Sequence, residues 1–339
     1  MRSIRLWFLL AGGFLFGLLG ASGALRIAGV NLAGRSSPAR PGVPSVQIVA
    51  QASVTPDASP VATPAPDAAV SATAAPSAST PGQSLFATAQ IVSYYGHPLS
   101  PAMGVLGEGS EQEMLERLKM QAAAYQALNP DKAVIPALHL IYEVAQALTS
   151  DDGLYLYRTD DATVRHFIDL TRDQGMLLFL DLQIGRSSLK AELPYVLPYL
   201  REPHVHLAID PEFVTPPGFR PGMFIGSLDC LQVNDAEDAI ERLVEEANLP
   251  NKIVIVHQFE DDMLINKDKL RFDEPRVDTV LDMDGFGDQS GKLSKYDTLV
   301  RQFGAKYAGI KLFYTHDRVL LTPEQVEGLT PRPNVIIYQ

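Results

Sequence analysis

From Ile91 onward, short apolar runs alternate along the chain with amphipathic runs of helical period. This alternation is typical of parallel strands that are joined by crossover helices. We count eight strand–helix units and find no glycine-rich nucleotide-binding fingerprint among them. The pattern therefore predicts an α/β fold, and a closed (β/α)8 TIM barrel rather than an open doubly wound sheet.

The expected strands are short and mostly apolar. They span residues 89–96, 133–140, 176–182, 204–209, 252–257, 276–281, 309–314 and 334–338. The clearest expected helices span 111–128, 160–174, 235–248 and 293–303. Ser110 and Glu113 have the spacing of a capping box at the start of the first of these helices. No helix follows the last strand, so we expect another element, around Leu85 or among the loop helices, to cover that side of the barrel.

The chain divides into three zones. Residues 1–30 begin with Arg2 and Arg5 and continue with an apolar stretch, which predicts a signal peptide or a membrane anchor. Leu6 to Ala24 is 19 residues, enough for either reading. Residues 31–84 are rich in Ala, Pro, Ser and Thr and predict a disordered linker or stalk. Residues 85–339 have globular composition and the length of one TIM-barrel domain.

This organisation predicts an extracytoplasmic protein, either secreted or tethered to the membrane by its N-terminal segment. Charge supports the division into zones. The whole chain carries a net charge of −12, and the five arginines before residue 41 and the two aspartates of the stalk leave −15 on residues 85–339. An acidic domain repels phosphate backbones, so we expect no nucleic-acid partner. Cys230 is the only cysteine, which excludes an intramolecular disulfide.

Ionisable and aromatic residues stand where the expected strands end. In a parallel barrel these ends meet at one rim, and that rim is where such folds carry out chemistry. The sharpest motif is Asp210-Pro211-Glu212. Asp210 and Glu212 lie on one face of an extended strand, where two carboxylates raise one another's pKa and keep one of them protonated as an acid.

The Asp-x-Glu motif resembles that of TIM-barrel glycoside hydrolases such as the chitinase-like and muramidase-like families, where it ends the fourth strand. The resemblance implies that Glu212 is the proton donor and that Asp210 supports it. The spaced aspartates that precede the chitinase-type Glu are missing, since His204 to Ile209 stand there. Lys311 to Tyr314 stand where a retaining enzyme would have its nucleophilic Glu, so the family within this group stays open.

Glycosidic cleavage needs a second carboxyl group across the bond. Asp282 is our prediction for this group, with Asp284 and Glu260 as substitutes. The Asp282-Met283-Asp284-Gly285 turn also suits Ca²⁺ or a solvated loop, although the full EF-hand pattern is absent.

Further rim positions are predicted to bind substrate. They are Tyr95, His97, Asp181, Gln183, Arg186, Gln258, Glu260, Asp284 and Tyr314. Two alternatives bear on this set. Asp181 and Arg186 would also serve as a structural ion pair. Alternation in the strand that ends at residues 257–260 allows either Gln258 and Glu260 or His257 and Phe259 to face the rim, but not both pairs.

We recognise no metal-binding signature and expect no cofactor. His204-Val205-His206 has the spacing of a metal pair but stands at the start of its strand, away from the rim. The expected partner is carbohydrate, of the cell-wall or surface polysaccharide kind. A barrel that binds such a polysaccharide without cleaving it is the main alternative, and a metal-dependent hydrolase with Asp and His at the rim is a further one.

Overall fold

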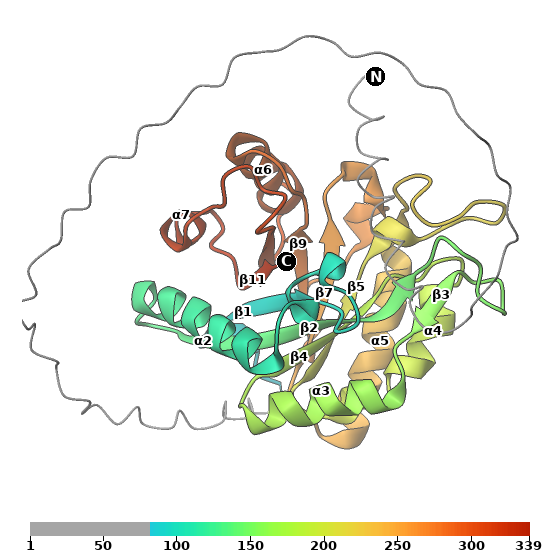
Figure 1. Ribbon diagram of the computed structural model, residues 1–339, viewed down its shortest axis with the longest axis horizontal. Coiled ribbons are helices and arrows are strands. Elements are labelled where there is room, and N and C mark those ends of the chain that lie inside the picture. Colours follow the sequence, from blue (N-terminus) through green and yellow to red (C-terminus); the bar gives the residue numbers. More distant parts are fainter. Residues whose placement is uncertain (1–81) are drawn as a thin grey trace, which may run out of the picture. The chain divides into compact units, whose positions relative to one another are not determined.

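A computed structural model describes residues 82–339, which form a closed eight-stranded parallel barrel (Figure 1). Around the cylinder the strands follow the order β1, β2, β4, β5, β7, β9, β10, β11, and β11 pairs with β1 to close it. The predicted TIM-barrel fold is therefore confirmed for this part of the chain.

The barrel strands lie close to their predicted positions. They are β1 (Ala89–Gly96), β2 (Ala133–Ala145), β4 (Leu177–Leu182), β5 (Val205–Ile209), β7 (Lys252–Gln258), β9 (Val277–Met283), β10 (Tyr307–Leu312) and β11 (Val335–Tyr338). Strand β2 is longer than predicted, because its end pairs with the antiparallel strand β3 (Leu156–Arg158). A separate two-stranded pair joins β6 (Leu228–Asp229) to β8 (Leu264–Ile265).

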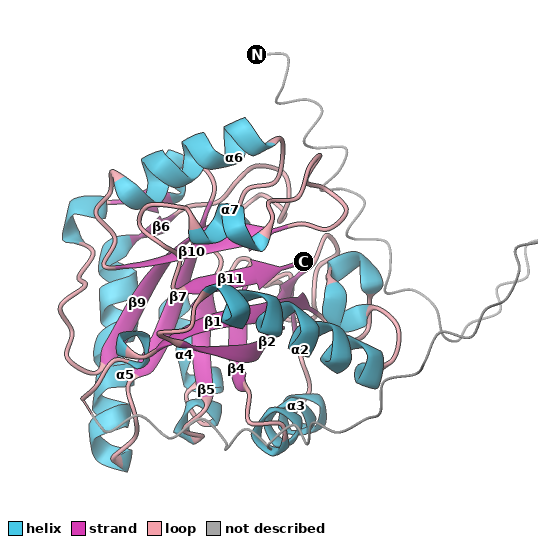
Figure 2. Ribbon diagram, turned by 90° about the vertical axis from the view of Figure 1, so that its left-hand side faces the viewer, coloured by secondary structure: helices cyan, strands magenta, loops and turns pink. Residues whose placement is uncertain are grey.

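Helices surround the strands (Figure 2). They are α2 (Glu111–Leu128), α3 (Asp161–Asp173), α4 (Leu189–Val196), α5 (Cys230–Ala247), α6 (Gln289–Tyr296) with its π-helical continuation η9 (Asp297–Arg301), and α7 (Pro323–Glu327). Short 3₁₀ turns are η2 (Leu85–Ala87), η3 (Pro101–Met103), η4 (Val105–Gly107), η5 (Tyr199–Arg201), η6 (Pro211–Phe213), η7 (Asp261–Met263) and η8 (Lys267–Lys269).

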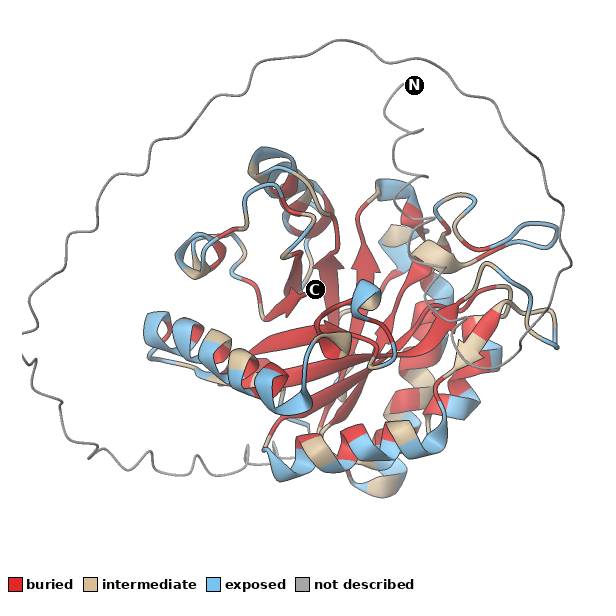
Figure 3. Ribbon diagram, in the orientation of Figure 1, coloured by how far each residue is buried: buried red, intermediate tan, exposed pale blue. Residues whose placement is uncertain are grey.

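Helix α2 shows how local sequence sets these elements. The Ser110 hydroxyl accepts from the Glu113 amide, and the Glu113 carboxylate accepts from the Ser110 amide, so the predicted capping box is formed. Met114, Leu118 and Ala122 recur at helical spacing and are buried against the barrel. In Figure 3 the helices are buried on the side that faces the strands and exposed on the other.

Alternation along the strands divides the core into two layers. Side chains that point outward, such as Val92, Leu138 and Val254, pack beneath the helices. Side chains that point inward, such as Ile91 and Ile255, fill the barrel interior. Most inward positions near the strand starts are apolar, with His206 and Asp278 as exceptions. Polar and ionisable side chains become more frequent toward the strand ends, so the inward face leads from the core to the site.

The last strand, β11, is covered by two neighbouring helices. The Tyr125 hydroxyl of α2 lies 2.8 Å from the Tyr338 hydroxyl of β11, and α7 packs against α2. Of the two alternatives expected for this side, the element around Leu85 does not cover it. Turn η2 instead inserts Phe86 among the inward residues at the strand starts, where its ring lies 4.7 Å from that of Tyr307, and so closes that end of the barrel.

The predicted signal or anchor (1–30) and nearly all of the predicted stalk (31–84) lie outside the described residues, and both stay predictions. Within residues 82–339, none of the helices combines the length and the hydropathy that a bilayer crossing requires.

Candidate active site

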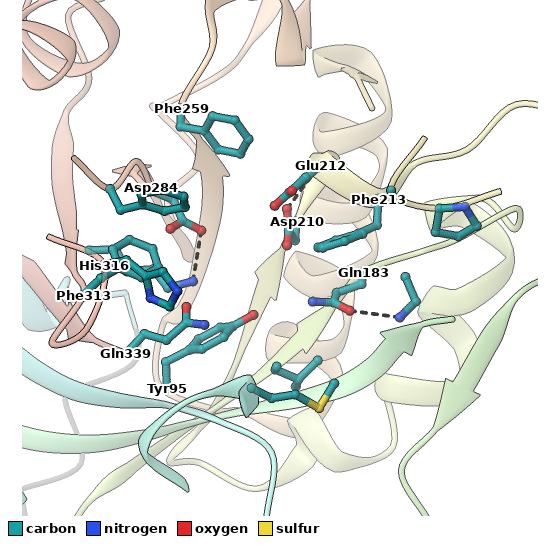
Figure 4. A pocket seen from close by; sticks show the side chains of 17 residues that line it. Tyr95, Gln183, Asp210, Glu212, Phe213, Phe259, Asp284, Phe313, His316 and Gln339 are labelled. Atoms are coloured by element: carbon teal, nitrogen blue, oxygen red, sulfur yellow. Dashed lines mark hydrogen bonds and ion pairs between the residues drawn. The ribbon is translucent and has the colours of Figure 1, made fainter. Parts of the chain in front are cut away.

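A pocket opens at the mouth of the barrel, above the polar part of the interior. Carboxylates on two sides of it face one another, with Asp210 and Glu212 on one side and Asp284 on the other (Figure 4). The empty volume, counted out to open solvent, is about 1100 Å³. Aromatic and apolar side chains supply much of the remaining lining: Tyr95, Met103, Ile141, Phe213, Phe259, Phe286, Phe313 and His316. The site thus combines opposed acids with flat apolar surfaces.

Asp210 and Glu212 are positioned by the turn that ends β5. The Asp210 side chain caps η6 by accepting from the Glu212 amide at 3.0 Å, and the Asp210 amide donates to the Leu182 carbonyl. Asp210 is buried, whereas Glu212 is partly exposed. The Asp-x-Glu spacing therefore sets a tight turn that turns both carboxyl groups into the pocket.

Asp284 faces these two acids from the loop after β9. Its Oδ2 lies 3.0 Å from Lys311 Nζ, which stacks 3.5 Å above the centre of the Tyr95 ring. Burial lowers the pKa of Lys311, but Asp284, Asp210 and Asp181 outweigh it and the net shift is upward. Lys311 therefore stays protonated. Burial still raises the pKa of Asp284, and Lys311 is the largest effect that opposes this rise.

The two acids on the opposite side have raised pKa values. Burial, and then the charge of Asp284, raise the pKa of Glu212 to about 7, against a smaller opposing effect of Lys311. Burial, and then Glu212 and Asp181, raise the pKa of Asp210 well above its usual range. Among the described residues, no Lys, Arg or His lies within ion-pair distance of Glu212. One side of the pocket is therefore suited to donate a proton and the other to carry a negative charge.

Asp282, the predicted second carboxylate, does not line the pocket. It is fully buried in β9, and its Oδ2 lies 2.9 Å from His257 Nδ1. Burial raises its pKa to about 7. Asp284, which was named as a substitute, has the place across from Glu212, because β9 extends to Met283 and so keeps Asp282 inside the barrel. Asp282 and Asp284 lie on the same strand face, two residues apart, and only Asp284 lines the pocket.

Three other predicted positions belong to the site or its floor. Tyr95 and Gln183 line the pocket, and the Gln183 side-chain oxygen accepts from the Ala145 amide. Tyr94 points the opposite way into the outer core, as expected for adjacent residues of a strand. Asp181 lies beneath the lining and accepts from the Tyr95 hydroxyl at 2.9 Å.

His97 and Tyr314 lie outside the pocket. The His97 ring is buried against Thr159, 3.1 Å from its hydroxyl, and burial lowers the pKa of His97 to about 4. Tyr314 stacks on Tyr338 in the outer core and shares a hydrogen bond with Tyr94. Both stand just past a strand end, where the chain has already turned away from the pocket.

Arg186, Gln258 and Glu260 also lie outside the pocket. Arg186 donates to the Phe219 carbonyl and covers the Tyr155 ring, so the alternative of an Asp181–Arg186 pair is wrong as well. Gln258 points outward and donates to the Leu299 carbonyl, and Glu260 pairs with Lys295 at 2.9 Å. Of the two faces that the sequence allowed, the one with His257 and Phe259 points inward.

Several residues of the site were not selected from the sequence. Phe213 lies in the turn η6, and Phe286, Phe313 and His316 lie in loops, where alternation does not predict the direction of a side chain. His139 lies on the inward face of β2 beside Tyr95, with ring centres 5.0 Å apart. A histidine inside an otherwise apolar strand run was the available signal for it.

The fold and the site together define a (β/α)8-barrel protein with opposed carboxylates at the mouth formed by its strand ends. No protein-family model and no curated protein sequence matches the chain. Two solved structures of Bacillus subtilis mannanase are similar to it, each at 10% identity over 74% of this chain and 79% of the other. One is of mannanase man26, with a TM-score of 0.39, and the other of mannanase BCman, with 0.38. At this identity and TM-score, the similarity assigns no role to any residue of this chain.

Proposed function

We propose that this protein hydrolyses a glycosidic bond, with Glu212 as the general acid. The observation that carries the proposal is the placement of Glu212, with a pKa near 7, across an aromatic pocket from Asp284, which pairs with Lys311. Glycosidases need one protonated and one ionised carboxyl group on opposite sides of the scissile bond. Aromatic rings such as Phe213 and Phe313 stack on the apolar C–H faces of sugar rings.

In the proposed reaction, Glu212 gives its proton to the glycosidic oxygen as the bond to the anomeric carbon breaks. The Asp284 carboxylate stabilises the positive charge that develops on the sugar ring, either by attack on the anomeric carbon or by activation of a water molecule. In both routes water supplies the hydroxyl group of the new sugar end. When Asp284 attacks, Glu212 regains its proton from the water that cleaves the covalent intermediate. When Asp284 activates the water, Asp284 takes that proton and Glu212 regains one from the solvent. Asp210 holds the turn that aims Glu212.

The proposed substrate is a cell-wall or surface polysaccharide, and the proposed place of action is outside the cytoplasm. Both rest on the basic and apolar start of the chain and on the Pro- and Ser-rich segment after it. Release of reducing sugar from a panel of cell-wall and storage glycans by the full chain identifies the substrate.

Glu212→Gln tests the assignment of the acid. Loss of a positioned general acid lowers turnover of the responsive glycan by about 10²- to 10⁴-fold, with the melting temperature nearly unchanged. A dinitrophenyl glycoside of the same sugar has a leaving group that needs no protonation, so Glu212→Gln still cleaves it while Asp284→Asn does not. Equal activity of Glu212→Gln and wild type on the natural glycan would exclude Glu212 from this role.

A second candidate is a barrel that binds the polysaccharide without cleaving it. The ion pair of Asp284 with Lys311 favours this reading, because it offers a charge pair to sugar hydroxyl groups rather than a free carboxylate. Binding of a glycan by wild-type protein, measured by calorimetry, with no product after long incubation would establish it. Slow product formation that Glu212→Gln abolishes would support the enzyme.

A further inference from the structure

Two histidines and an aspartate converge inside the barrel, beneath the pocket. His139 of β2, Asp181 of β4 and His257 of β7 are each at most 1% exposed. One ligand atom from each lies within 4.8 Å of one from each of the others, and His257 Nε2 lies 4.0 Å from Asp181 Oδ1. Strands β2 and β4 are neighbours in the barrel and β7 lies beyond β5, so the curvature of the sheet turns the three side chains toward one another inside it.

The atoms that face one another in this cluster have no hydrogen-bond partner. They are both ring nitrogens of His139, Asp181 Oδ1 and His257 Nε2. A buried polar atom without a partner costs about 1–3 kcal/mol. Lys311 is the nearby cation, but its hydrogen bond goes to Asp284. Asp181 Oδ1 and, in a neutral imidazole, one nitrogen of each histidine are acceptors, and one bound cation would satisfy these three atoms together.

Asp282 and Tyr95 contact the cluster from outside and orient its side chains, as hydrogen-bonded neighbours orient the ligands of a metal ion. Asp282 Oδ2 lies 2.9 Å from His257 Nδ1 and so holds the ring with Nε2 as the nitrogen that faces Asp181. The Tyr95 hydroxyl donates to Asp181 Oδ2 and leaves Oδ1 directed at His257. A carboxylate behind a ligating histidine is the usual support in metal sites.

We propose that His139, Asp181 and His257 bind one divalent transition-metal ion inside the barrel, beneath the pocket. Two imidazoles and one carboxylate suit Zn²⁺ and neighbouring ions, whereas Ca²⁺ and Mg²⁺ prefer oxygen ligands throughout. Two ligand atoms at about 2.1 Å from such an ion and at a tetrahedral angle lie about 3.4 Å apart. The observed 4.0 Å therefore needs only a small inward movement.

The ion would also fix the floor of the pocket. Tyr95 connects Asp181 to the pocket lining, and Asp284 Oδ2 lies 3.5 Å from His257 Nδ1. This site does not depend on the glycosidase proposal, because its occupancy is measured without any substrate.

Metal content of the full chain, purified without a histidine tag and dialysed against metal-free buffer, tests the proposal. We expect about one ion per chain by mass spectrometry, or one equivalent taken up from Zn²⁺ or Co²⁺ after chelation. Bound Co²⁺ gives visible absorption bands typical of nitrogen and oxygen ligands. Wild-type protein that takes up neither ion would overturn the proposal without recourse to any variant.

Variants locate the ion. His139→Gln, His257→Gln and Asp181→Asn are expected to abolish stoichiometric binding, and Asp282→Asn to weaken it about 10- to 100-fold. His206→Gln is the matched control: His206 is also buried in the barrel, but its Nδ1 accepts from the Ile253 amide and it lies outside the cluster, so this variant keeps the metal. Stoichiometric metal that persists in folded His257→Gln, checked by circular dichroism, would equally overturn the proposal.

Discussion

At the scale of single residues, the pocket holds two carboxyl groups of similar intrinsic acidity, Glu212 and Asp284, that differ in their charged partners. Glu212 has little to stabilise its charge, whereas Asp284 has Lys311 at 3.0 Å. Burial raises the pKa of both side chains, and the basic partner favours ionisation of Asp284. A difference in partners therefore separates an acid from a carboxylate within one pocket.

The pH dependence of glycan hydrolysis follows from this contrast. Glu212 must be protonated to act as an acid, and its pKa is raised to about 7 by burial and by Asp284, against Lys311. Activity is therefore kept at weakly acidic pH and falls as pH rises through about 7. A pH profile of kcat/KM measures this limb. An alkaline limb centred near pH 4 to 5, the range of an unperturbed Glu, would contradict the assigned environment.

Gly309 is a second residue with a testable constraint. A Cβ atom at Gly309 would lie 2.7 Å from Asp282 Oδ1 and 3.1 Å from the Asp282 backbone, closer than van der Waals contact allows. Gly309→Ala should therefore cost about 1–3 kcal/mol, typical of overpacking in a core, and lower the melting temperature. Gly291→Ala is the control, because its added methyl group meets only ordinary contacts near the N-terminus of α6. A similar melting temperature for both variants would contradict the packing argument.

At the scale of elements, the turn η6 follows the end of β5 and positions the Glu212 side chain. Asp210→Asn keeps an oxygen that accepts from the Glu212 amide, whereas Asp210→Ala removes it. The alanine variant should lose about 0.5–2 kcal/mol more stability than the asparagine variant, and more activity, because the aim of Glu212 changes. Chemical denaturation and kcat on the responsive glycan measure the two losses. Equal behaviour of the two variants would show that the cap does not position Glu212.

Helices and strands were predictable where the local sequence contains a clear start or stop signal. Strand β1 and helix α2 begin and end at the predicted residues, because a capping box opens α2 and Asn129-Pro130 follows it. The direction of side chains in buried strands was harder. Residues 253–256 are apolar on both faces, so alternation could not tell that His257 points inward and Gln258 outward.

The sequence also did not predict how deep in the barrel each inward side chain lies. Asp282 and Asp284 share one strand face, and only the observed end of β9 at Met283 places the first below the pocket and the second at its lining. Likewise, His139, Asp181 and His257 are distant in sequence and meet inside the barrel through the pairing order and curvature of the sheet. The sequence predicted that the strand ends converge at one rim. Which side chains lie at the same depth depends on the register between neighbouring strands.

At the scale of the whole molecule, net charge bears on which glycans reach the pocket. Residues 85–339 carry −15, and charge of one sign lowers the encounter rate with polymers of the same sign. Within the pocket lining, Lys311 supplies positive charge but is paired with Asp284. The long-range field therefore favours a neutral polysaccharide over an anionic one.

This preference predicts a salt effect that differs between substrates. At low ionic strength, kcat/KM for a neutral glycan should exceed that for a carboxylated glycan of the same linkage by about 10-fold or more. Added salt should narrow the gap by speeding cleavage of the anionic glycan, because charges are screened beyond about 10 Å at 0.1 M salt. The neutral glycan is the internal control, since its rate should change little. Faster cleavage of the anionic glycan at low salt would show that the local field at the pocket mouth is positive and outweighs the acidic domain around it.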